Sequence, residues 1–371
     1  MQSFNPPVRT LMGSGPSDVH PRILSAMAKP TIGHLDPIFI AMMDEIKEGL
    51  KTIFKTDNKL TMPISAPGSA GMEACFTNLV EPNDKVIICI NGVFGMRMKE
   101  NVTRLGGKAI IVKDNWGEAI STDKLEHALK NNPNANIVAF VHAETSTGAQ
   151  SDVKTLCKLA HQYDCITIVD AVTSLGGTEL YVDEWEIDAI YSGTQKCLSA
   201  MPGISLISFG KRAIQKLNTR KTSVNSWFLD LNLIMNYWNG DSKRTYHHTA
   251  PVNMLYGLHE SLVMILEEGI ENSWVRHKKN HELLKNGLEA MNINFLVNKK
   301  DRLPQLNSVL IPKGFDDEKI RSILLNDYNL EISAGLGAYT GKIWRIGLMG
   351  YSSRKENIVL CLSALKEILR K

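Results

Sequence analysis

The stretch Ile166-Thr167-Ile168-Val169-Asp170 is followed along the chain by Ala189-Ile190-Tyr191-Ser192-Gly193-Thr194-Gln195-Lys196. Each stretch begins as a short apolar run, which is typical of a strand buried on both faces of a parallel sheet. The first run ends in a carboxylate, and the second leads through small polar residues to a lysine. In open α/β sheets, ligands bind at the carboxyl ends of such strands.

The spacing of these two charged residues indicates one cofactor. Asp170 ends its strand, and Lys196 follows 26 positions later (196 minus 170) in a loop. Pyridoxal 5′-phosphate needs such a pair, because a lysine holds its aldehyde as a Schiff base and an aspartate keeps its pyridine nitrogen protonated. We therefore predict a pyridoxal-phosphate site around Lys196 and Asp170.

Short apolar runs alternate with amphipathic stretches through the first part of the chain. This order predicts an α/β fold with a mostly parallel central sheet covered by helices on both faces. Strands are expected at Leu60–Ile64, Val86–Ile90, Ala109–Val112, Ile137–Val141, Ile166–Val169, Ala189–Tyr191 and Ile204–Phe209. Helices are expected at Met96–Leu105, Thr122–Lys130 and Val153–Tyr163, with caps within Ser121-Thr122-Asp123 and Ser151-Asp152 for the last two.

The last part of the chain predicts a smaller α+β domain. Two long helical patterns lead into it, at Pro251–Glu268 and Ser273–Met291. Further elements are expected at Ser308–Ile311 (strand), Asp316–Asn326 (helix), Glu331–Ser333 (strand), Trp344–Ile346 (strand) and Arg354–Leu369 (helix). Since 371 residues are too many for one compact unit, we expect three parts. They are an N-terminal segment (1–20), a large cofactor-binding domain (21–260) and a small domain (261–371).

Composition argues against several classes of protein. The net charge is +3 with interspersed signs, and no basic block favours nucleic acid. No apolar run approaches the roughly 20 residues of a membrane span, and Met1–Pro7 does not resemble a signal peptide. Six scattered cysteines form no C-x-x-C pair and show no metal spacing with histidines. We therefore expect a cytoplasmic protein with reduced cysteines, no metal, and neither membrane nor nucleic acid as partner.

Small and aromatic residues near the predicted strand ends provide further candidates. The loop Pro67–Ala74 follows a strand and opens a helix, whose free N–H groups suit a phosphate, although a plain helix start is equally compatible. Phe94 follows the strand Val86–Ile90 and could stack on a flat ring or simply pack. Thr145 follows Ile137–Val141 and could bind the phenolic oxygen region of the cofactor, or complete a polar turn.

Arg345 stands alone in the apolar pattern Trp344-Arg345-Ile346-Gly347. A buried guanidinium needs an anion, and its fork fits a carboxylate. An amino-acid or keto-acid substrate supplies that carboxylate. A structural salt bridge is the alternative.

These motifs together resemble the class V aminotransferases, most closely the alanine–glyoxylate and serine–pyruvate enzymes and the bacterial ureidoglycine–glyoxylate relatives. The resemblance extends from about Leu11 to Leu369. It rests on motifs that occur in the family's order: Gly13–Ser17, Pro67–Ala74, Glu144–Gly148, Val169–Val172, Ser192–Lys196, Tyr246–Thr249 and Arg345–Gly347.

The resemblance implies a fold-type-I homodimer with active sites shared between subunits. Carried over by position, Lys196 is the Schiff-base lysine and Asp170 the pyridinium partner. The remaining cofactor residues are Gly68, Ser69, Ala70 and Gln195 at the phosphate loop, Phe94 and Val172 on the two ring faces, Thr145, and Tyr246 and Thr249 reaching the phosphate from the neighbouring subunit. Arg345 would bind the substrate carboxylate, with Gly13 near the small end of the pocket.

Several positions depart from the relatives. Ser69 stands where mammalian-type enzymes carry histidine, which keeps the backbone donors but removes a side chain. His34 and the Ser226-Trp227 pair stand near positions where the ureidoglycine enzymes use polar residues, and this disfavours a ureide substrate without excluding it. Gln195 before Lys196 argues against a cysteine desulfurase, which has histidine there.

Three functions remain open from the sequence. The first is a ping-pong aminotransferase that moves the amino group of alanine or serine to glyoxylate or pyruvate. The second is a ureidoglycine–glyoxylate aminotransferase of purine breakdown, and the third is a non-catalytic protein of the same fold that binds a small ligand. A dinucleotide oxidoreductase is a weaker rival, because Gly13–Asp18 lacks the third glycine of the Rossmann fingerprint.

Overall fold

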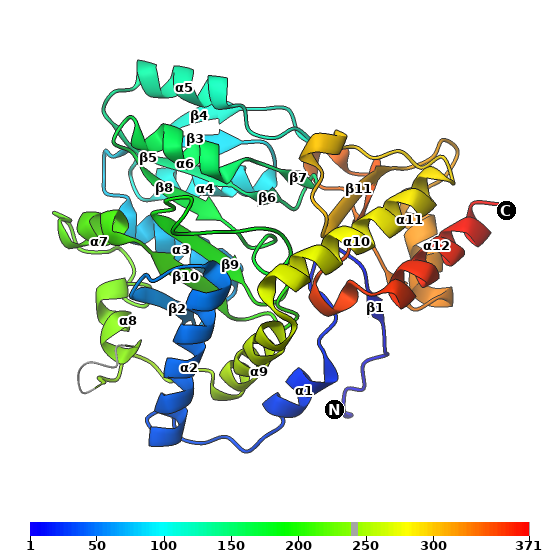
Figure 1. The fold of residues 1–371 in the computed structure, drawn as a ribbon, viewed down its shortest axis with the longest axis horizontal. Helices are drawn as coiled ribbons and strands as arrows, with labels where there is room; N and C mark the ends of the chain where they lie inside the picture. The colour runs from blue at the N-terminus through cyan, green and yellow to red at the C-terminus, as the bar shows by residue number, and fades with distance from the viewer. Residues whose placement is uncertain (239–243, 371) are drawn as a thin grey trace.

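The computed structural model describes residues 1–238 and 244–370 (Figure 1). Within them, the largest sheet has seven strands in the order β2-β10-β9-β8-β5-β3-β4. Its strands are β2 (Leu60–Ile64), β3 (Lys85–Ile90), β4 (Lys108–Lys113), β5 (Ala135–Val141), β8 (Ile166–Asp170), β9 (Ala189–Gly193) and β10 (Ser205–Phe209). Only β10 runs antiparallel to its neighbours, which confirms the predicted mostly parallel sheet.

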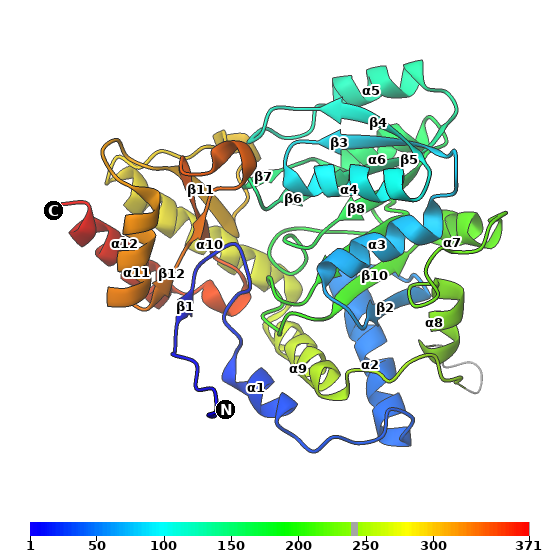
Figure 2. The same ribbon diagram turned by 180° about the vertical axis from the view of Figure 1, so that it is seen from behind.

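Helices cover both faces of this sheet, as the alternating pattern predicts. Helices α3 (Gly68–Leu79) and α4 (Val93–Arg104) lie on one face, and α5 (Thr122–Asn131) and α6 (Val153–His161) on the other (Figures 1 and 2). Ser121 caps α5 by accepting from the Lys124 N–H at 3.4 Å, and Asp152 caps α6 by accepting from Thr155 at 3.1 Å. Both predicted caps are confirmed.

A second, smaller sheet lies toward the C-terminus. It has the antiparallel order β11-β14-β13, with β11 (Leu306–Leu310), β13 (Ser333–Ala334) and β14 (Ile343–Gly347). A separate hydrophobic core fills the space between this sheet and the neighbouring helices α10 (Ile270–Glu289), α11 (Asp317–Asp327) and α12 (Lys355–Ile368). Met12 belongs to this core, so the N-terminal segment packs against the smaller unit.

The strand expected at Glu331–Ser333 is wrong as a single element. It is two short strands that pair with different partners. β12 (Leu330–Glu331) pairs with β1 (Thr10–Leu11), whereas β13 pairs with β14. Ile332 separates them because its side chain is buried in the smaller core.

Long helices connect the two sheets. Helix α9 (Val252–Glu268) packs on α1 (Pro21–Met27) and α2 (Pro37–Phe54), and α10 continues toward the smaller sheet (Figure 1). Gly269, with φ of 84°, separates α9 from α10. The remaining elements are α7 (Lys211–Asn218), α8 (Leu231–Trp238), the hairpin β6 (Ala143–Glu144) and β7 (Ala149–Gln150), and short 3-10 helices at Lys299–Asp301, Gly337–Tyr339 and Gly350–Ser352. None of the described helices is long and apolar enough to cross a membrane.

Candidate active site

Lys196 lies in the connection between β9 and β10 and is 9% exposed. Its Nζ donates to the backbone oxygen of Ser14, in the N-terminal segment that lies over it. Gly15 leaves the necessary room, since a Cβ there would stand 2.5 Å from the lysine nitrogen. Burial and, to a smaller extent, the positive charge of Arg345 lower the pKa of Lys196 to about 8. A large fraction of this amine is therefore neutral near pH 8.

Asp170 ends β8, next to Lys196 at the carboxyl edge of the sheet. Its side chain is buried and accepts two hydrogen bonds of 2.8 Å, from the Val172 N–H to Oδ1 and from the Tyr191 hydroxyl to Oδ2. Burial raises the pKa of Asp170 to about 6, against the opposite effect of these donors and of Lys196. The carboxyl is thus held in a fixed orientation inside the fold, where a nearby cation would favour its ionised form.

The start of α3 lies against the same sheet edge. Gly68 and Ser69 are its first two residues, and the helix has no side-chain cap. Backbone N–H groups at such positions have no partner within their own helix and suit an anion. A Cβ on Gly68 would lie 3.5 Å from Val172 and 3.7 Å from Gly193, so the loop meets β9 and the segment after Asp170. Ala70 turns back into the helix by donating to Pro67 at 2.7 Å.

Gln195 adds a polar side chain to this region. Its Oε1 is buried, and among the described residues no donor lies within hydrogen-bond distance of it. Gly193 lies against it, since a Cβ there would stand 2.9 Å from Oε1. A buried amide oxygen without a donor costs free energy, so a ligand hydrogen bond here would be stabilising.

Arg345 is carried by β14 and is 5% exposed. Its Nε donates to the Ala334 carbonyl at 2.7 Å, and one terminal nitrogen donates to the Thr145 carbonyl at 3.0 Å. Within residues 1–238 and 244–370, no carboxylate forms an ion pair with it, which removes the structural salt bridge as an explanation. Burial lowers its pKa to about 10, and it lines a cavity of about 370 Å³.

The N-terminal segment closes the site on the side of Arg345. A Cβ on Gly13 would stand 2.6 Å from Ser333 Oγ, and Ser14 N–H donates to that hydroxyl at 2.9 Å. Ser333 pairs with Arg345 across the small sheet. Ser333 therefore contacts the N-terminal segment through its hydroxyl and pairs with Arg345 in the sheet.

Phe94 and Thr145 follow neighbouring strands of the large sheet. Phe94 is the second residue of α4, is partly buried, and has the Arg97 guanidinium 4.9 Å from its ring centroid. Thr145 is buried, and its hydroxyl lies 2.7 Å from that of Thr173. Between their segments lies Glu144, a fully buried carboxyl to which the sequence analysis assigns no role.

Tyr246 and Thr249 are predicted site residues that the single chain leaves on its surface, as it does Ser69. Tyr246 is 63% exposed, and Thr249 is also exposed. Their segment lies against the start of α3, because His248 Nε2 is 2.7 Å from Ser65 Oγ. His34 packs nearby, with ring centroids 5.5 Å from Tyr246.

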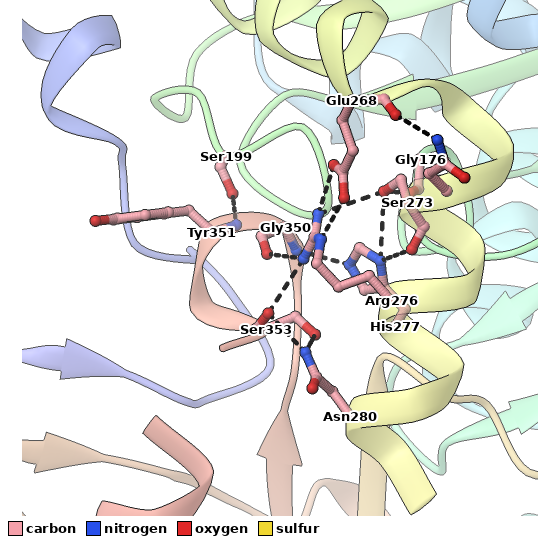
Figure 3. A network of polar contacts seen from close by, with 11 residues as sticks. Gly176, Ser199, Glu268, Ser273, Arg276, His277, Asn280, Gly350, Tyr351 and Ser353 are labelled. Carbon is pink, nitrogen blue, oxygen red and sulfur yellow. Dashed lines mark hydrogen bonds and ion pairs between the residues drawn. The ribbon is translucent and has the colours of Figure 1, made fainter. Parts of the chain in front are cut away.

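Four side chains of α10, Ser273, Arg276, His277 and Asn280, form what we call the polar joint (Figure 3). The joint links the segments that follow Asp170, Lys196 and Arg345. Arg276 on α10 forms a bidentate ion pair with Glu268 at 2.5 and 2.9 Å and donates to the carbonyls of Gly350 and Ser353 at 2.8 and 3.2 Å. His277 Nε2 accepts from the Gly350 N–H at 2.9 Å, so α10 holds both backbone groups of that glycine.

The same joint contacts the loop that follows Lys196. Tyr351 N–H donates to Ser199 Oγ at 2.6 Å, and a Cβ on Gly350 would stand 2.6 Å from the Cys197 carbonyl (Figure 3). Ser273 Oγ donates to the Gly176 carbonyl at 2.7 Å, in the segment that follows Asp170. The first turns of α10 therefore connect the segments that follow Asp170, Lys196 and Arg345.

Sequence reasoning missed the residues that orient these groups. Three of them contact site residues that lie far away in the sequence: Tyr191, Ser14 and Ser333. A fourth, Glu144, lies within a quoted motif but was given no role. For Tyr191 a signal exists, because a tyrosine in an otherwise apolar buried strand requires a partner for its hydroxyl.

Comparisons with known proteins agree with this arrangement. The model of the family described as Aminotransferase class-V matches residues 23–358. The chain is 39% identical to the alanine–glyoxylate aminotransferase of Callithrix jacchus over 368 residues, covering 98% of this chain and 88% of the relative. It is 36% identical to the (S)-ureidoglycine–glyoxylate transaminase of Bacillus subtilis (strain 168) over 381 residues, covering 98% and 91%.

Solved structures give the same two similarities. The alanine–glyoxylate aminotransferase of Nostoc sp. has a TM-score of 0.97 and 43% identity, covering 100% of this chain and 97% of that one. The ureidoglycine–glyoxylate aminotransferase of Bacillus subtilis has a TM-score of 0.96 and 38% identity, covering 99% and 94%.

Proposed function

The chain belongs to the class V aminotransferases, and on that premise we propose that it moves the amino group of alanine or serine to glyoxylate or pyruvate with pyridoxal 5′-phosphate as its cofactor. One observation carries the proposal. Lys196 and Asp170 stand at the carboxyl ends of adjacent strands, buried together, with the free N-terminus of α3 beside them and Arg345 facing them.

The residues fit the proposed cofactor. The N–H groups that open α3 lie at the same edge as Gln195, whose side-chain amide can direct its own N–H groups to an anion. Asp170 is a buried carboxyl whose ionised form a pyridinium would stabilise. We assign Gly68, Ser69, Ala70 and Gln195 to the phosphate. The ring would lie between Phe94 and Val172, with Thr145 near its phenolic oxygen.

Bound pyridoxal phosphate would supply an aldehyde that bonds to amino groups and a ring that withdraws electrons from the substrate Cα. The side chains of this protein bind the substrate, orient it and move its protons. Arg345 binds the substrate carboxylate through its fork, because its hydrogen-bond partners in the described part of the chain are two neutral carbonyls. Asp170 holds a proton at the ring nitrogen, and Tyr191 and the Val172 N–H keep it oriented.

Lys196 transfers the proton of the reaction. Its lowered pKa gives a neutral amine near pH 8. This amine can take the proton from the substrate Cα and return it to the carbon on the other side of the substrate nitrogen. The segment Gly13–Ser17 lies over the lysine, since Lys196 Nζ donates to the Ser14 backbone oxygen and Ser17 Oγ donates to the Lys196 carbonyl at 2.7 Å. The same groups act on the acceptor in reverse, so ping-pong kinetics follow.

The assembly and the compartment are further parts of the proposal. We expect a homodimer in which Tyr246 and Thr249 reach the phosphate site of the neighbouring subunit, because both are exposed here beside the start of α3. We expect the protein to act in the cytoplasm on small amino and keto acids. Mixing inactive Lys196→Ala subunits with inactive Thr249→Ala subunits should restore activity only if sites are shared.

One experiment tests the proposal directly. Purified protein is loaded with pyridoxal phosphate, reduced with borohydride and digested, and mass spectrometry should find the cofactor on the peptide that contains Lys196. The unreduced enzyme should convert alanine and glyoxylate to pyruvate and glycine, and Lys196→Ala should lose both results. An unmodified Lys196 peptide in a protein that turns over these substrates would contradict the assignment.

The ureidoglycine–glyoxylate activity is the second candidate, favoured by the similarity to the Bacillus subtilis structure. Two observations weigh against it at the positions noted in the sequence. His34 Nδ1 already lies 2.9 Å from the Tyr237 hydroxyl, and Trp227 stacks on His247 with centroids 4.4 Å apart. A panel of alanine, serine, glycine and ureidoglycine as donors, with kcat/KM measured for each, distinguishes the two activities.

A further inference from the structure

Glu144 is a buried carboxyl in the centre of the site, and the mechanism above does not use it. It ends β6, is 0% exposed, and immediately precedes Thr145, whose carbonyl accepts from Arg345. Its Oε1 accepts from the N–H and the hydroxyl of Ser146 at 3.0 and 2.5 Å. Its Oε2 accepts from the backbone N–H of Phe94 at 3.3 Å, on a different element.

Helix α4 has no cap of its own. Its N-cap residue is Gly92, which has no side chain to accept a hydrogen bond. The first two N–H groups of the helix are instead satisfied from the β6–β7 hairpin. Val93 N–H donates to Ser146 Oγ at 3.0 Å, and Phe94 N–H donates to Glu144. An acidic group at a helix N-terminus is stabilising, so the hairpin supplies the cap that the helix lacks.

Gly92 makes this approach sterically possible. A Cβ at this position would stand 2.3 Å from Glu144 Cδ and 2.5 Å from Ser146 Oγ. Because the backbone of Gly92 contacts the carboxylate of Glu144, Glu144 determines where the first turn of α4 begins. Phe94 is in that turn, so the position of its ring depends on the same contact.

We propose that Glu144 is a positioning residue that caps α4 from outside the helix and thereby holds Phe94 at the angle required to cover one face of the cofactor ring. The inference rests on the proposed function, because it assigns Phe94 to the ring. Glu144 acts through Phe94 and contacts neither substrate nor cofactor itself.

The electrostatic effect of Glu144 on its charged and titratable neighbours must be distinguished from its hydrogen bond to Phe94. Asp170 and Tyr191 face the Glu144 carboxyl from β8 and β9, and Arg345 faces it from β14. Glu144→Gln removes the charge but keeps an acceptor oxygen for Phe94. Glu144→Ala removes both. Comparing the two variants therefore separates repulsion of Asp170 from loss of the cap.

The test is a double-mutant cycle on cofactor affinity, using Glu144→Ala, Phe94→Leu and the double variant. Each single variant should raise the dissociation constant for pyridoxal phosphate about tenfold, and the double variant should be little weaker than either, because both remove the same contact. The visible circular dichroism of the bound cofactor should change alike in all three. Glu144→Gln should rescue most of the affinity and the spectrum, and the surface control Glu184→Gln should leave both unchanged.

Several outcomes would overturn the inference. Additive losses in the double variant would show that Glu144 acts independently of Phe94, and unchanged affinity in Glu144→Ala would show that it has no role. If Glu144→Ala fails to fold, the same cycle is run with Glu144→Leu, which fills the space of the side chain but offers Phe94 no acceptor. Wild-type protein that binds no pyridoxal phosphate would instead contradict the proposed function, so the two failures are distinguishable.

Discussion

Tyr191 and Asp170 face each other across the adjacent strands β9 and β8, with the tyrosine hydroxyl 2.8 Å from Oδ2 of the carboxyl. Both side chains are buried. The hydroxyl lowers the pKa of Asp170 against the effect of burial, and burial together with the carboxylate raises the pKa of Tyr191 well above its usual range. A residue of a buried strand thus orients the carboxyl group that we assign to the ring nitrogen.

Tyr191→Phe should therefore weaken the enzyme without unfolding it. Hydrogen bonds to charged groups contribute about 1.5–3 kcal/mol, which corresponds to a loss of roughly 10- to 100-fold in kcat/KM. The loss should be in kcat, because Arg345 and the substrate carboxylate are untouched. Steady-state kinetics with alanine and glyoxylate measure it, with Tyr256→Phe as a control far from the site. An unchanged kcat would remove Tyr191 from the mechanism.

The rate at which cofactor-free protein binds pyridoxal phosphate should rise with pH through about 8. Only the neutral amine of Lys196 attacks the aldehyde, and burial lowers its pKa to about that value. Because Arg345 also lowers this pKa, Arg345→Met should move the midpoint to higher pH. Stopped-flow absorbance measures the profile, and the exposed Arg104→Met serves as the control. A midpoint near the ordinary lysine pKa in wild type would contradict the prediction.

Ionisation of Glu144 and Asp170 should lower the stability of cofactor-free protein as the pH rises from about 4 to about 7. Burial raises the pKa of Glu144 to about 7 and that of Asp170 to about 6, so these two groups bind more protons in the folded state than in the unfolded state. Their contribution is present below their ordinary pKa values and is lost as pH rises through the raised ones. Glu144→Gln should remove about 3 kcal/mol of this loss, measured by urea unfolding across pH. If the unfolding free energy changed with pH in the same way for the variant and the wild type, the prediction would be wrong.

Gly92→Ala should destabilise the protein by about 1–3 kcal/mol, because its methyl group would overlap the Glu144 side chain. Gly33→Ala is the matched control, since a Cβ at Gly33 meets nothing within 4 Å. Urea denaturation of both variants at one pH gives the comparison. Equal stabilities would mean that α4 can shift away from the hairpin at no cost.

Arg276→Met should raise KM more than it lowers kcat. The substitution removes the bonds that fix Gly350 and Ser353, and β14 with Arg345 leads directly into that segment. A tenfold or greater rise in KM for the carboxylate substrates is expected, since small displacements of a binding group are costly. Arg276→Lys should rescue it in part. If both variants have wild-type KM values, the joint does not position Arg345.

Much of the fold follows from the local pattern of residues. Strands such as Ile166–Asp170 are continuous apolar runs because they are buried on both faces, and that pattern is visible without tertiary information. Helix α2 is absent from the sequence-based expectations, although Asp36 caps it and Pro37 begins it, so a usable start signal was present. Helix α4 begins three residues before the expected Met96, because its first turn is capped from the hairpin rather than by its own sequence.

The site could be predicted only where a residue's role depends on its neighbours in sequence. Lys196, Asp170 and the start of α3 each follow a strand, so the topology alone collects them at one edge. The partners of Tyr191 and Glu144 depend instead on strand register and on the approach of α4 to the hairpin. The split of the predicted strand at Ile332 has a similar origin, because the pairing partners of β12 and β13 lie far away in the chain.

The joint at the start of α10 has a consequence for how variants of this protein are interpreted. Arg276, His277 and Asn280 bind the backbone of Gly350 and Ser353, and Ser273 binds that of Gly176. Inherited or selected changes at these four side chains would damage turnover while leaving every proposed substrate-contacting group intact. In a genetic screen they would be scored as catalytic lesions, so a map of loss-of-function alleles should show a second cluster on α10 beside the one around Lys196.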